Sequence, residues 1–229
     1  MAQSKAWDKE YQTNNLVTNS TEPQNDFKKF IKFLRKEQKV DISTLKVLDL
    51  GSGTGKNSIF LAERGANCTG LEISDTAIGL AKKRAAESNL TETTFIKQSF
   101  GETFPFSDAT FDLALDIMSS NSLTEAERAL YLEEVARTLK PQGFFFVRLL
   151  ALDGDKHAQT LIKDHPGAES GTYVLPEVGI TERVLTRDEF IAYYSPFFNI
   201  LKLEKNSSYA HVKNTKYKRH YWVAYLQKK

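Results

Sequence analysis

Val-Leu-Asp-Leu-Gly-Ser-Gly-Thr-Gly-Lys-Asn, residues 47–57, is the stretch that decides the fold. A short apolar strand pattern, Lys46 to Leu50, runs into a turn with glycine at every second position, and a helical pattern follows over 56–64. Glycine adopts positive φ and lets a ligand approach main-chain N–H groups closely. The helix behind the turn adds unpaired N–H donors at its positive end. The stretch therefore predicts a strand, a ligand-binding turn and a helix.

A second apolar run, residues 67–73, carries Glu72 near its end. An acidic residue at the tip of the second strand is where a ribose diol is usually held. The dinucleotide fingerprint G-x-G-x-x-G needs a glycine where this chain has Lys56. The spacing thus favours a nucleoside ligand and argues against a dinucleotide such as NAD.

The composition bounds the class of protein. The chain has 229 residues, 41% of them hydrophobic, which is enough for one compact domain. Its 31 basic and 29 acidic residues give a net charge of +2, which demands no polyanionic partner. Basic residues gather late in the chain, and a solvated surface explains them better than a nucleic-acid patch. The single cysteine, Cys68, excludes an intrachain disulfide, and no spacing predicts a metal site.

The same pattern bears on the cellular compartment. No apolar run approaches the ~18 residues of a membrane span. Residues 1–8 lack the apolar centre of a signal peptide. We therefore expect a cytoplasmic protein that does not enter a membrane.

Hydrophobic periodicity predicts the remaining elements. Trp7 and Tyr11, four residues apart, share one face of a short helix. The other predicted elements are an amphipathic helix with Phe27, Phe30, Ile31 and Leu34 on one face, helices at 76–88 and 124–139, and strands at 94–98, 111–117, 144–150, 200–203 and 221–226. Pro141 and Gly143 are expected to end the second of these helices. Up to residue 150 the order predicts a doubly wound, mostly parallel sheet.

Residues 151–185 break this rhythm, because they are polar and punctuated by glycine and proline. A connection this long in a compact domain is usually a lid or a binding loop. A new helix is expected to begin at Thr186. We expect residues 1–25 and 151–185 to cover a binding pocket together.

The motif order resembles the class I SAM-dependent methyltransferase family over about residues 26–229. Residues 47–55 look like its first motif, and Glu72 lies where the family has its acidic loop. Phe104-Pro-Phe106, and the turn Pro141-Gln-Gly143, are also similar to family stretches. The resemblance implies a seven-stranded sheet with the last strand antiparallel and inserted beside strand five. Residues 1–25 would be an N-terminal cap segment, and 26–229 the methyltransferase domain with a lid insertion at about 151–185.

Two finer features are similar to the small-molecule branch that includes tellurite-resistance and thiol methyltransferases. They are Gly55-Lys-Asn-Ser-Ile-Phe-Leu-Ala62 and an early Trp-Asp-x-x-Tyr, residues 7–11. The resemblance then implies transfer of a methyl group from SAM to a small-molecule acceptor, with release of S-adenosylhomocysteine (SAH). The alternatives are an RNA or protein methyltransferase, and a module that binds SAM without turnover.

The resemblance also implies a set of cofactor-binding residues. They are Asp49, Gly51, Ser52, Gly53, Gly55, Asn57, Glu72, Ile73, Phe100, Gly101, Glu102 and Asp116. The chain departs from the family where an Asp often accepts from the adenine amino group, because Phe100 stands there. Either Glu102 takes that role, or backbone or water does. Phe100 is expected either to stack on adenine or to be ordinary core.

Methyl transfer from a sulfonium is an in-line displacement, so the protein mainly positions the reactants. A nucleophile that must lose a proton also needs a general base. The sequence does not identify that base, and the candidates are His157, Asp116 and Tyr11. Each has an ordinary structural role as an alternative. The candidates for contacting the acceptor are Trp7, Tyr11, Arg148, His157, Tyr173 and His220.

Overall fold

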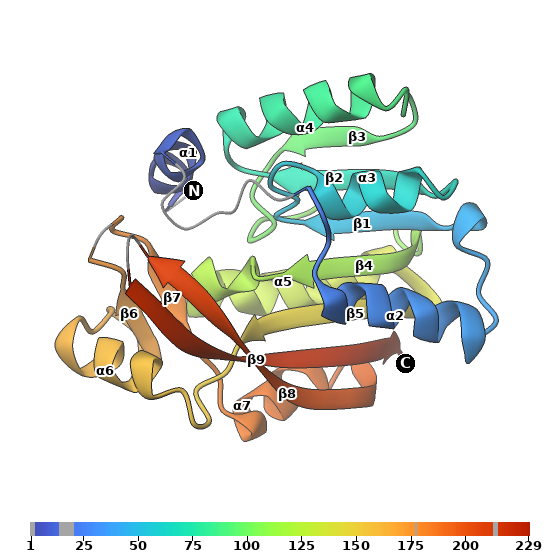
Figure 1. Ribbon diagram of the computed structural model, residues 1–229. Helices are drawn as coiled ribbons and strands as arrows, with labels where there is room; N and C mark the ends of the chain where they lie inside the picture. The colour runs from blue at the N-terminus through green and yellow to red at the C-terminus, as the bar shows by residue number, and fades with distance from the viewer. Residues whose placement is uncertain (1–2, 14–20, 177, 213–214) are drawn as a thin grey trace.

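The structure is a computed structural model that describes residues 3–13, 21–176, 178–212 and 215–229. Its centre is a seven-stranded sheet in the order β3-β2-β1-β4-β5-β9-β8, with helices on both faces (Figure 1). The strands are β1 (Lys46–Leu50), β2 (Asn67–Glu72), β3 (Thr94–Lys97), β4 (Phe111–Ile117), β5 (Leu139–Leu150), β8 (Phe198–Val212) and β9 (Thr215–Lys228). The helices are α1 (Ser4–Thr13), α2 (Asn25–Lys36), α3 (Lys56–Ala62), α4 (Asp75–Glu87), α5 (Glu125–Thr138), α6 (Lys156–Asp164) and α7 (Arg187–Tyr194).

The topology confirms the predicted fold class. Strands β1 to β5 pair in parallel, whereas β9 pairs antiparallel with both β5 and β8. The last strand is therefore inserted beside strand five. The strand order changes direction at β1, because β2 and β3 lie on one side of it and β4 on the other. Ligands bind at such a switch point in open α/β sheets.

Two apolar clusters, one on each face, hold the helices to the sheet. On one face α2 buries Phe27, Phe30, Ile31 and Leu34, all four of the residues predicted to share its apolar side. On the other face α5 and α7 pack against β4 and β5. Burial of this apolar surface is the main stabilising term of the fold.

Local capping signals set several helix boundaries. Thr124 and Glu127 form a reciprocal capping box at the start of α5, as their spacing predicts. Ser74 caps α4 by accepting from the Ala77 N–H. Thr186 caps α7 in the same way as Thr124, with Glu189 as its partner.

The expected end of α5 is wrong in one respect. The helix ends at Thr138, and β5 begins at once at Leu139, before Pro141 and Gly143. The β4–β5 register shifts between Phe111 and Leu113, so the residues around Pro141 form an irregular stretch of the strand. A proline without an N–H donor is tolerated at such a bulge.

The C-terminal hairpin is much longer than expected. The predicted strands at 200–203 and 221–226 are only parts of β8 and β9, which pair with each other as far as residues 212 and 215, whereas β9 pairs with β5 over 221–227. Beyond the end of β5 the hairpin extends toward α6, β6 (Thr172–Val174) and β7 (Thr181–Arg183) (Figure 1). Antiparallel strands with a solvated face have no continuous apolar run, so the hydrophobic pattern of the sequence did not indicate the outer parts of these strands.

The insertion at 151–185 has regular structure of its own. Helix α6 and the two-stranded β6–β7 sheet enclose a separate apolar cluster that includes Ala158, Leu161, Tyr173, Ile180 and Tyr221. Glycine and proline in this segment therefore lie in the short turns between these elements, and the segment is not an irregular loop. No helix among the described residues is long and apolar enough to cross a membrane.

Candidate active site

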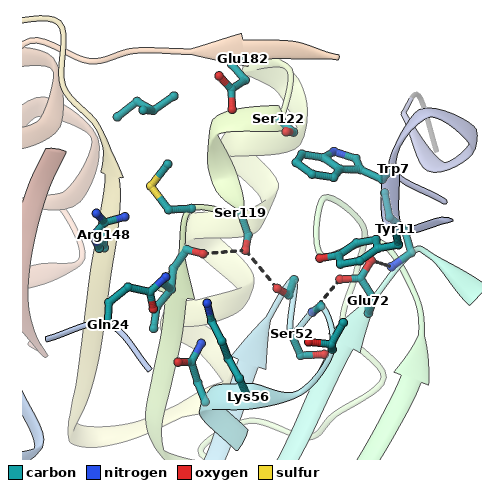
Figure 2. Close-up of a pocket in the computed structure, with 18 of the residues that line it drawn as sticks. Trp7, Tyr11, Gln24, Ser52, Lys56, Glu72, Ser119, Ser122, Arg148 and Glu182 are labelled. Carbon is teal, nitrogen blue, oxygen red and sulfur yellow. Dashed lines mark hydrogen bonds between the residues drawn. The ribbon is translucent and has the colours of Figure 1, made fainter. Parts of the chain in front are cut away.

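A cavity of about 990 Å³ lies at the carboxyl ends of the central strands (Figure 2). Its floor is the glycine turn after β1, together with the ends of β2, β4 and β5. Its cover comes from α1, the insertion and the hairpin, which contribute Trp7, Tyr11, His157, Leu175, Glu182 and Tyr217. The cavity thus lies at the switch point that the strand order predicts.

Two of the three motif glycines face this cavity. Gly51 and Gly53 have φ of +65° and +54°, a region that favours glycine. A Cβ on Gly53 would lie 2.6 Å from the Tyr11 hydroxyl oxygen, inside the cavity wall. Gly55, with φ +77°, packs instead against Phe95 and lies outside the wall. A ligand can therefore reach the turn at Gly51 and Gly53, whereas Gly55 packs against the core.

Glu72 connects the glycine turn to the end of β2. One carboxylate oxygen accepts the Gly53 N–H at 2.8 Å, and the other accepts the N–H groups of Ile73 and Ser74 at 2.8 and 2.9 Å. Burial of this carboxyl raises its pKa above the usual range for glutamate. Glu72 lines the cavity beside Tyr11 (Figure 2), so its remaining lone pairs can accept from a ligand.

Unsatisfied polar atoms lie in the same wall. The Ser52 hydroxyl oxygen and the Asn57 carbonyl oxygen Oδ1 are buried and have no hydrogen-bond partner among the described residues. Buried polar groups are nearly always hydrogen-bonded, so groups of this kind indicate a place for a polar ligand. Together with Glu72 they fit a nucleoside that carries hydroxyl and amino groups.

Asp49 and Asp116 lie behind the wall. Asp49 accepts the Ser58 hydroxyl at 2.7 Å and so joins β1 to α3. Asp116 accepts the N–H groups of Ser119 and Ser120 and the Tyr131 hydroxyl. Neither side chain lines the cavity, so both act on the site through the loops that they brace.

The burial of Asp49 leads to a testable pH dependence. Burial raises its pKa to about 6, from an ordinary 3.8. A carboxyl whose folded-state pKa is raised stabilises the fold most below its unfolded pKa, and this contribution is lost as pH rises through 6. Asp49→Asn, which mimics the protonated form, should therefore gain about 2–3 kcal/mol of stability relative to the parent between pH 4 and pH 8. Urea unfolding at both pH values measures this, and a pH-independent difference would contradict it.

The apolar part of the wall is suited to a planar base. Ile73 and Phe100 both line the cavity. Phe100 also packs edge-on against Tyr131 at 5.6 Å between ring centroids, so it belongs to the core and to the wall at once. Gly101 and Glu102 lie outside the wall, and Glu102 is exposed to solvent.

The predicted acceptor residues divide into two groups. Trp7, Tyr11, Arg148 and His157 line the cavity, and His157 stacks on Tyr217 at 3.9 Å. Tyr173 does not reach the cavity, because it is fully buried in the insertion. Its hydroxyl donates to Glu182 at 2.7 Å and accepts from Arg219.

His220 also lies outside the wall, where its backbone N–H donates to Asp155.

Sequence reasoning missed other residues of the wall. They are Gln24, Lys56, Met118, Ser119, Glu182, Tyr209, Tyr217, Arg219 and Tyr221, among others. Most come from the hairpin and the insertion, whose strands were predicted only in part. Lys56 was visible in the sequence, but only as the residue that broke the dinucleotide pattern.

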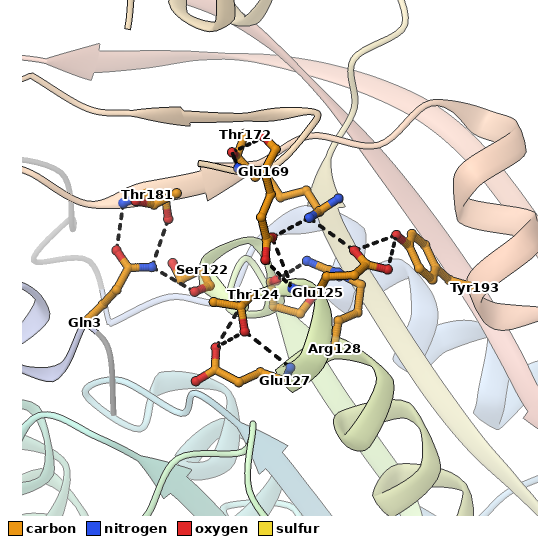
Figure 3. Close-up of polar contacts among 12 residues, drawn as sticks. Gln3, Ser122, Thr124, Glu125, Glu127, Arg128, Glu169, Thr172, Thr181 and Tyr193 are labelled. Carbon is orange, nitrogen blue, oxygen red and sulfur yellow. Dashed lines mark hydrogen bonds and ion pairs between the residues drawn. The ribbon is translucent and has the colours of Figure 1, made fainter. Parts of the chain in front are cut away.

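The roof of the cavity is held by polar contacts on two sides. The Asp8 carboxylate in α1 accepts the Ser74 hydroxyl and the Thr76 N–H at the start of α4. On the other side, Gln3 bridges the Ser122 carbonyl and the backbone of Thr181 (Figure 3). Helix α1 and the residue before it therefore connect the start of α4 with the insertion.

The insertion is anchored to α5 as well. Glu169 accepts the Glu125 N–H and pairs with Arg183 at 2.6 Å, while the Tyr193 hydroxyl donates to the Glu125 carboxylate (Figure 3). Exposed pairs of this kind contribute little stability individually, but several around one buried Arg fix an orientation. The insertion thus has a defined position over the cavity.

Comparison with known proteins connects this geometry to a family. Residues 47–143 match the family model described as a methyltransferase domain. An uncharacterized methyltransferase of Synechocystis is 36% identical over 100 residues, which is 44% of each chain. A fatty-acid O-methyltransferase of Mycolicibacterium smegmatis is 33% identical over 107 residues, 46% of this chain and 37% of that one. The matched part thus spans less than half the length of these relatives.

Solved structures agree over a larger part of the fold. A SAM-dependent methyltransferase from Methanosarcina mazei has a TM-score of 0.69 at 24% identity, covering 81% of this chain and 93% of that one. TehB from Haemophilus influenzae has a TM-score of 0.68 at 16% identity, covering 92% and 64%. At such identities the likeness concerns the fold. The chain thus matches a methyltransferase domain over residues 47–143 and has the fold of SAM-dependent methyltransferases.

Proposed function

We propose that the protein is an enzyme that binds SAM in this cavity and transfers its methyl group to a small-molecule acceptor, releasing SAH. The observation that carries the proposal is the continuity of the cavity. One space runs from the open glycines and Glu72, at the end of β1 and β2, to an aromatic chamber under α1 and the insertion. A cofactor and a small acceptor can therefore lie side by side in it.

The residues that line the cavity have separate roles in this proposal. Glu72 accepts from the two ribose hydroxyls, while Ile73 and Phe100 contact the adenine ring. The turn at Gly51 and Gly53 lets the amino-acid end of the ligand approach the backbone. SAM, when bound, supplies a methyl group that is already activated for displacement. The chain then contributes mainly orientation and exclusion of water, which in well-held pairs supply ~7–11 kcal/mol.

The apolar and aromatic lining of the acceptor end favours a small molecule over RNA or protein. Trp7, Leu150, Leu175 and Tyr221 provide apolar and aromatic walls there. Asp8 and Gln3 tie α1 and the residue before it to the rest of the fold, so the aromatic residues of α1 have a defined place over this end of the cavity. A similar relative bears the name of a fatty-acid O-methyltransferase, which is consistent with a small acceptor. We further propose a cytoplasmic location, where the free Cys68 stays reduced.

The proposal is tested by measuring SAH formed from SAM with separate acceptor pools. The pools are small phenols, thiols, amines and carboxylic acids, then total RNA, then a protein extract freed of small molecules. The expected result is turnover with a small-molecule pool and none with the macromolecules. Turnover restricted to RNA or protein would contradict the proposal. SAM binding without turnover in any pool would favour a non-catalytic SAM-binding module instead.

A further inference from the structure

The chamber under α1 and the insertion contains a buried carboxylate. Glu182 of β7 exposes 9% of its surface and lines the cavity. Its oxygen Oε2 accepts the Tyr173 hydroxyl at 2.7 Å. Its other oxygen, Oε1, has no hydrogen-bond partner among the described residues. A carboxylate oxygen can accept more than one hydrogen bond, so Oε1 is open to a donor on a ligand.

The cation nearby in the wall does not pair with this carboxylate. Arg219 also lines the cavity, but its Nε pairs with Asp155 at 3.0 Å and its Nη2 donates to the Tyr173 hydroxyl oxygen at 2.7 Å. Burial raises the pKa of Tyr173, so the hydroxyl keeps its hydrogen and points it at Glu182. Among the described residues no ion pair joins Glu182 to a cation. A charge held away from water normally has a counter-charge, which a cationic ligand would supply.

Ser122 lies beside Glu182 in the same wall. Strand β7 packs against η2 (Ser120–Ser122), and the Gln3 side chain joins the Ser122 carbonyl to the backbone of Thr181, the residue before Glu182. The Ser122 hydroxyl oxygen is buried and has no hydrogen-bond partner among the described residues. Figure 2 shows both side chains at one end of the pocket. Two polar groups that lack a partner therefore meet there.

Apolar side chains surround this pair. Trp7, Met118, Leu150 and Leu175 line the cavity and belong to the apolar cluster of the insertion. Pockets for small molecules have this composition, a mostly apolar wall with a few polar groups that fix the orientation of the ligand. An aromatic or aliphatic body would contact these four side chains while a polar head reached Glu182.

We propose that Glu182 and Ser122 form an acceptor anchor, a site that binds the protonated amino group of a small acceptor with an apolar body. This inference rests on the proposed function and names the class of its acceptor. The ammonium donates a charge-assisted hydrogen bond to Glu182 Oε1 and a second hydrogen bond to the Ser122 hydroxyl. A protonated amine has no lone pair, so this group is the part of the acceptor that is bound, and another atom receives the methyl group.

NMR titrations of the SAH complex with three small probes test the anchor. The probes share a phenyl ring and differ in the polar head, and they are 2-phenylethylamine, 2-phenylethanol and 3-phenylpropanoate. The parent should bind the amine most tightly and the acid least, because the acid brings a second negative charge beside Glu182. Glu182→Gln should weaken binding of the amine by at least about tenfold, the loss of one charge-assisted contact, and leave binding of the alcohol nearly unchanged.

Two further variants complete the test. Glu182→Gln keeps an oxygen that can accept from Tyr173, so its fold should be retained, and Ser122→Ala should weaken binding of both the amine and the alcohol. Glu133→Gln, at an exposed glutamate of α5, is the matched control and should change neither.

A parent complex that binds the three probes equally or not at all would overturn the anchor, as would a preference for the amine that survives in Glu182→Gln. A parent protein that does not bind SAH would instead refute the proposed function, so the two failures are distinguishable.

Discussion

Gly53→Val is expected to abolish measurable binding of SAM and SAH. Gly53 has φ +54°, which a β-branched residue adopts only with strain, at a cost of about 1–2 kcal/mol. Its side chain would also project into the cavity, where a Cβ would already lie 2.6 Å from the Tyr11 hydroxyl oxygen. The substitution therefore removes the space through which a ligand reaches the backbone. Isothermal calorimetry on the folded variant measures the loss.

Gly79→Val is the matched control for this substitution. Gly79 is an exposed residue of α4, and a Cβ there would meet no heavy atom within 4 Å. This variant should bind SAM as the parent does. A folded Gly53→Val protein with the affinity of the parent would show that the ligand lies elsewhere in the molecule.

Glu72→Ala is expected to weaken SAM binding by about 1.5–3 kcal/mol, the range for a lost charge-assisted hydrogen bond. The structure adds a second effect, because the carboxylate also accepts the N–H groups of Gly53, Ile73 and Ser74. Leaving such donors unpaired costs stability, about 1–3 kcal/mol. The sequence alone indicated no such cost, since a carboxylate at a strand end packs against little. Calorimetry gives the first quantity, and urea unfolding gives the second.

Glu102→Ala tests whether Glu102 or Glu72 contacts the nucleoside part of the cofactor. Glu102 is exposed and outside the cavity wall, so its removal should change neither affinity nor stability by more than about 0.5 kcal/mol. If Glu72→Ala bound SAM as tightly as the parent, the ribose role of Glu72 would be wrong. If Glu102→Ala were the weaker binder, the adenine amino group would be held by that residue.

The parts of the fold that the sequence predicted are those decided by local physics. The strand at 111–117 has the predicted bounds, because its centre, Leu113 to Leu115, is the continuous apolar run of a strand covered on both faces. The start of α5 follows from Thr124 and Glu127 alone. The glycine turn and Glu72 are close together in the chain, so their meeting at one end of the sheet follows from the βαβ order.

The parts that the sequence did not predict depend on distant contacts. The outer halves of β8 and β9 are polar because one face is solvated, so periodicity did not separate them from a loop. The Tyr173 hydroxyl is hydrogen-bonded to Glu182 and Arg219, and this network joins the insertion to the hairpin. Asp116 was predicted to be a site residue because it is an acid at the end of a central strand. In the structure its carboxylate accepts hydrogen bonds from Ser119, Ser120 and Tyr131, and these contacts hold it behind the cavity wall.

The most direct test of the central claim is calorimetry of the purified protein with SAM, SAH and NAD. The account predicts saturable binding of SAM and SAH, because Gly51, Gly53 and Glu72 open onto one cavity. It predicts no binding of NAD, because Lys56 stands where a dinucleotide turn needs glycine. Binding of NAD without binding of SAM or SAH would contradict it.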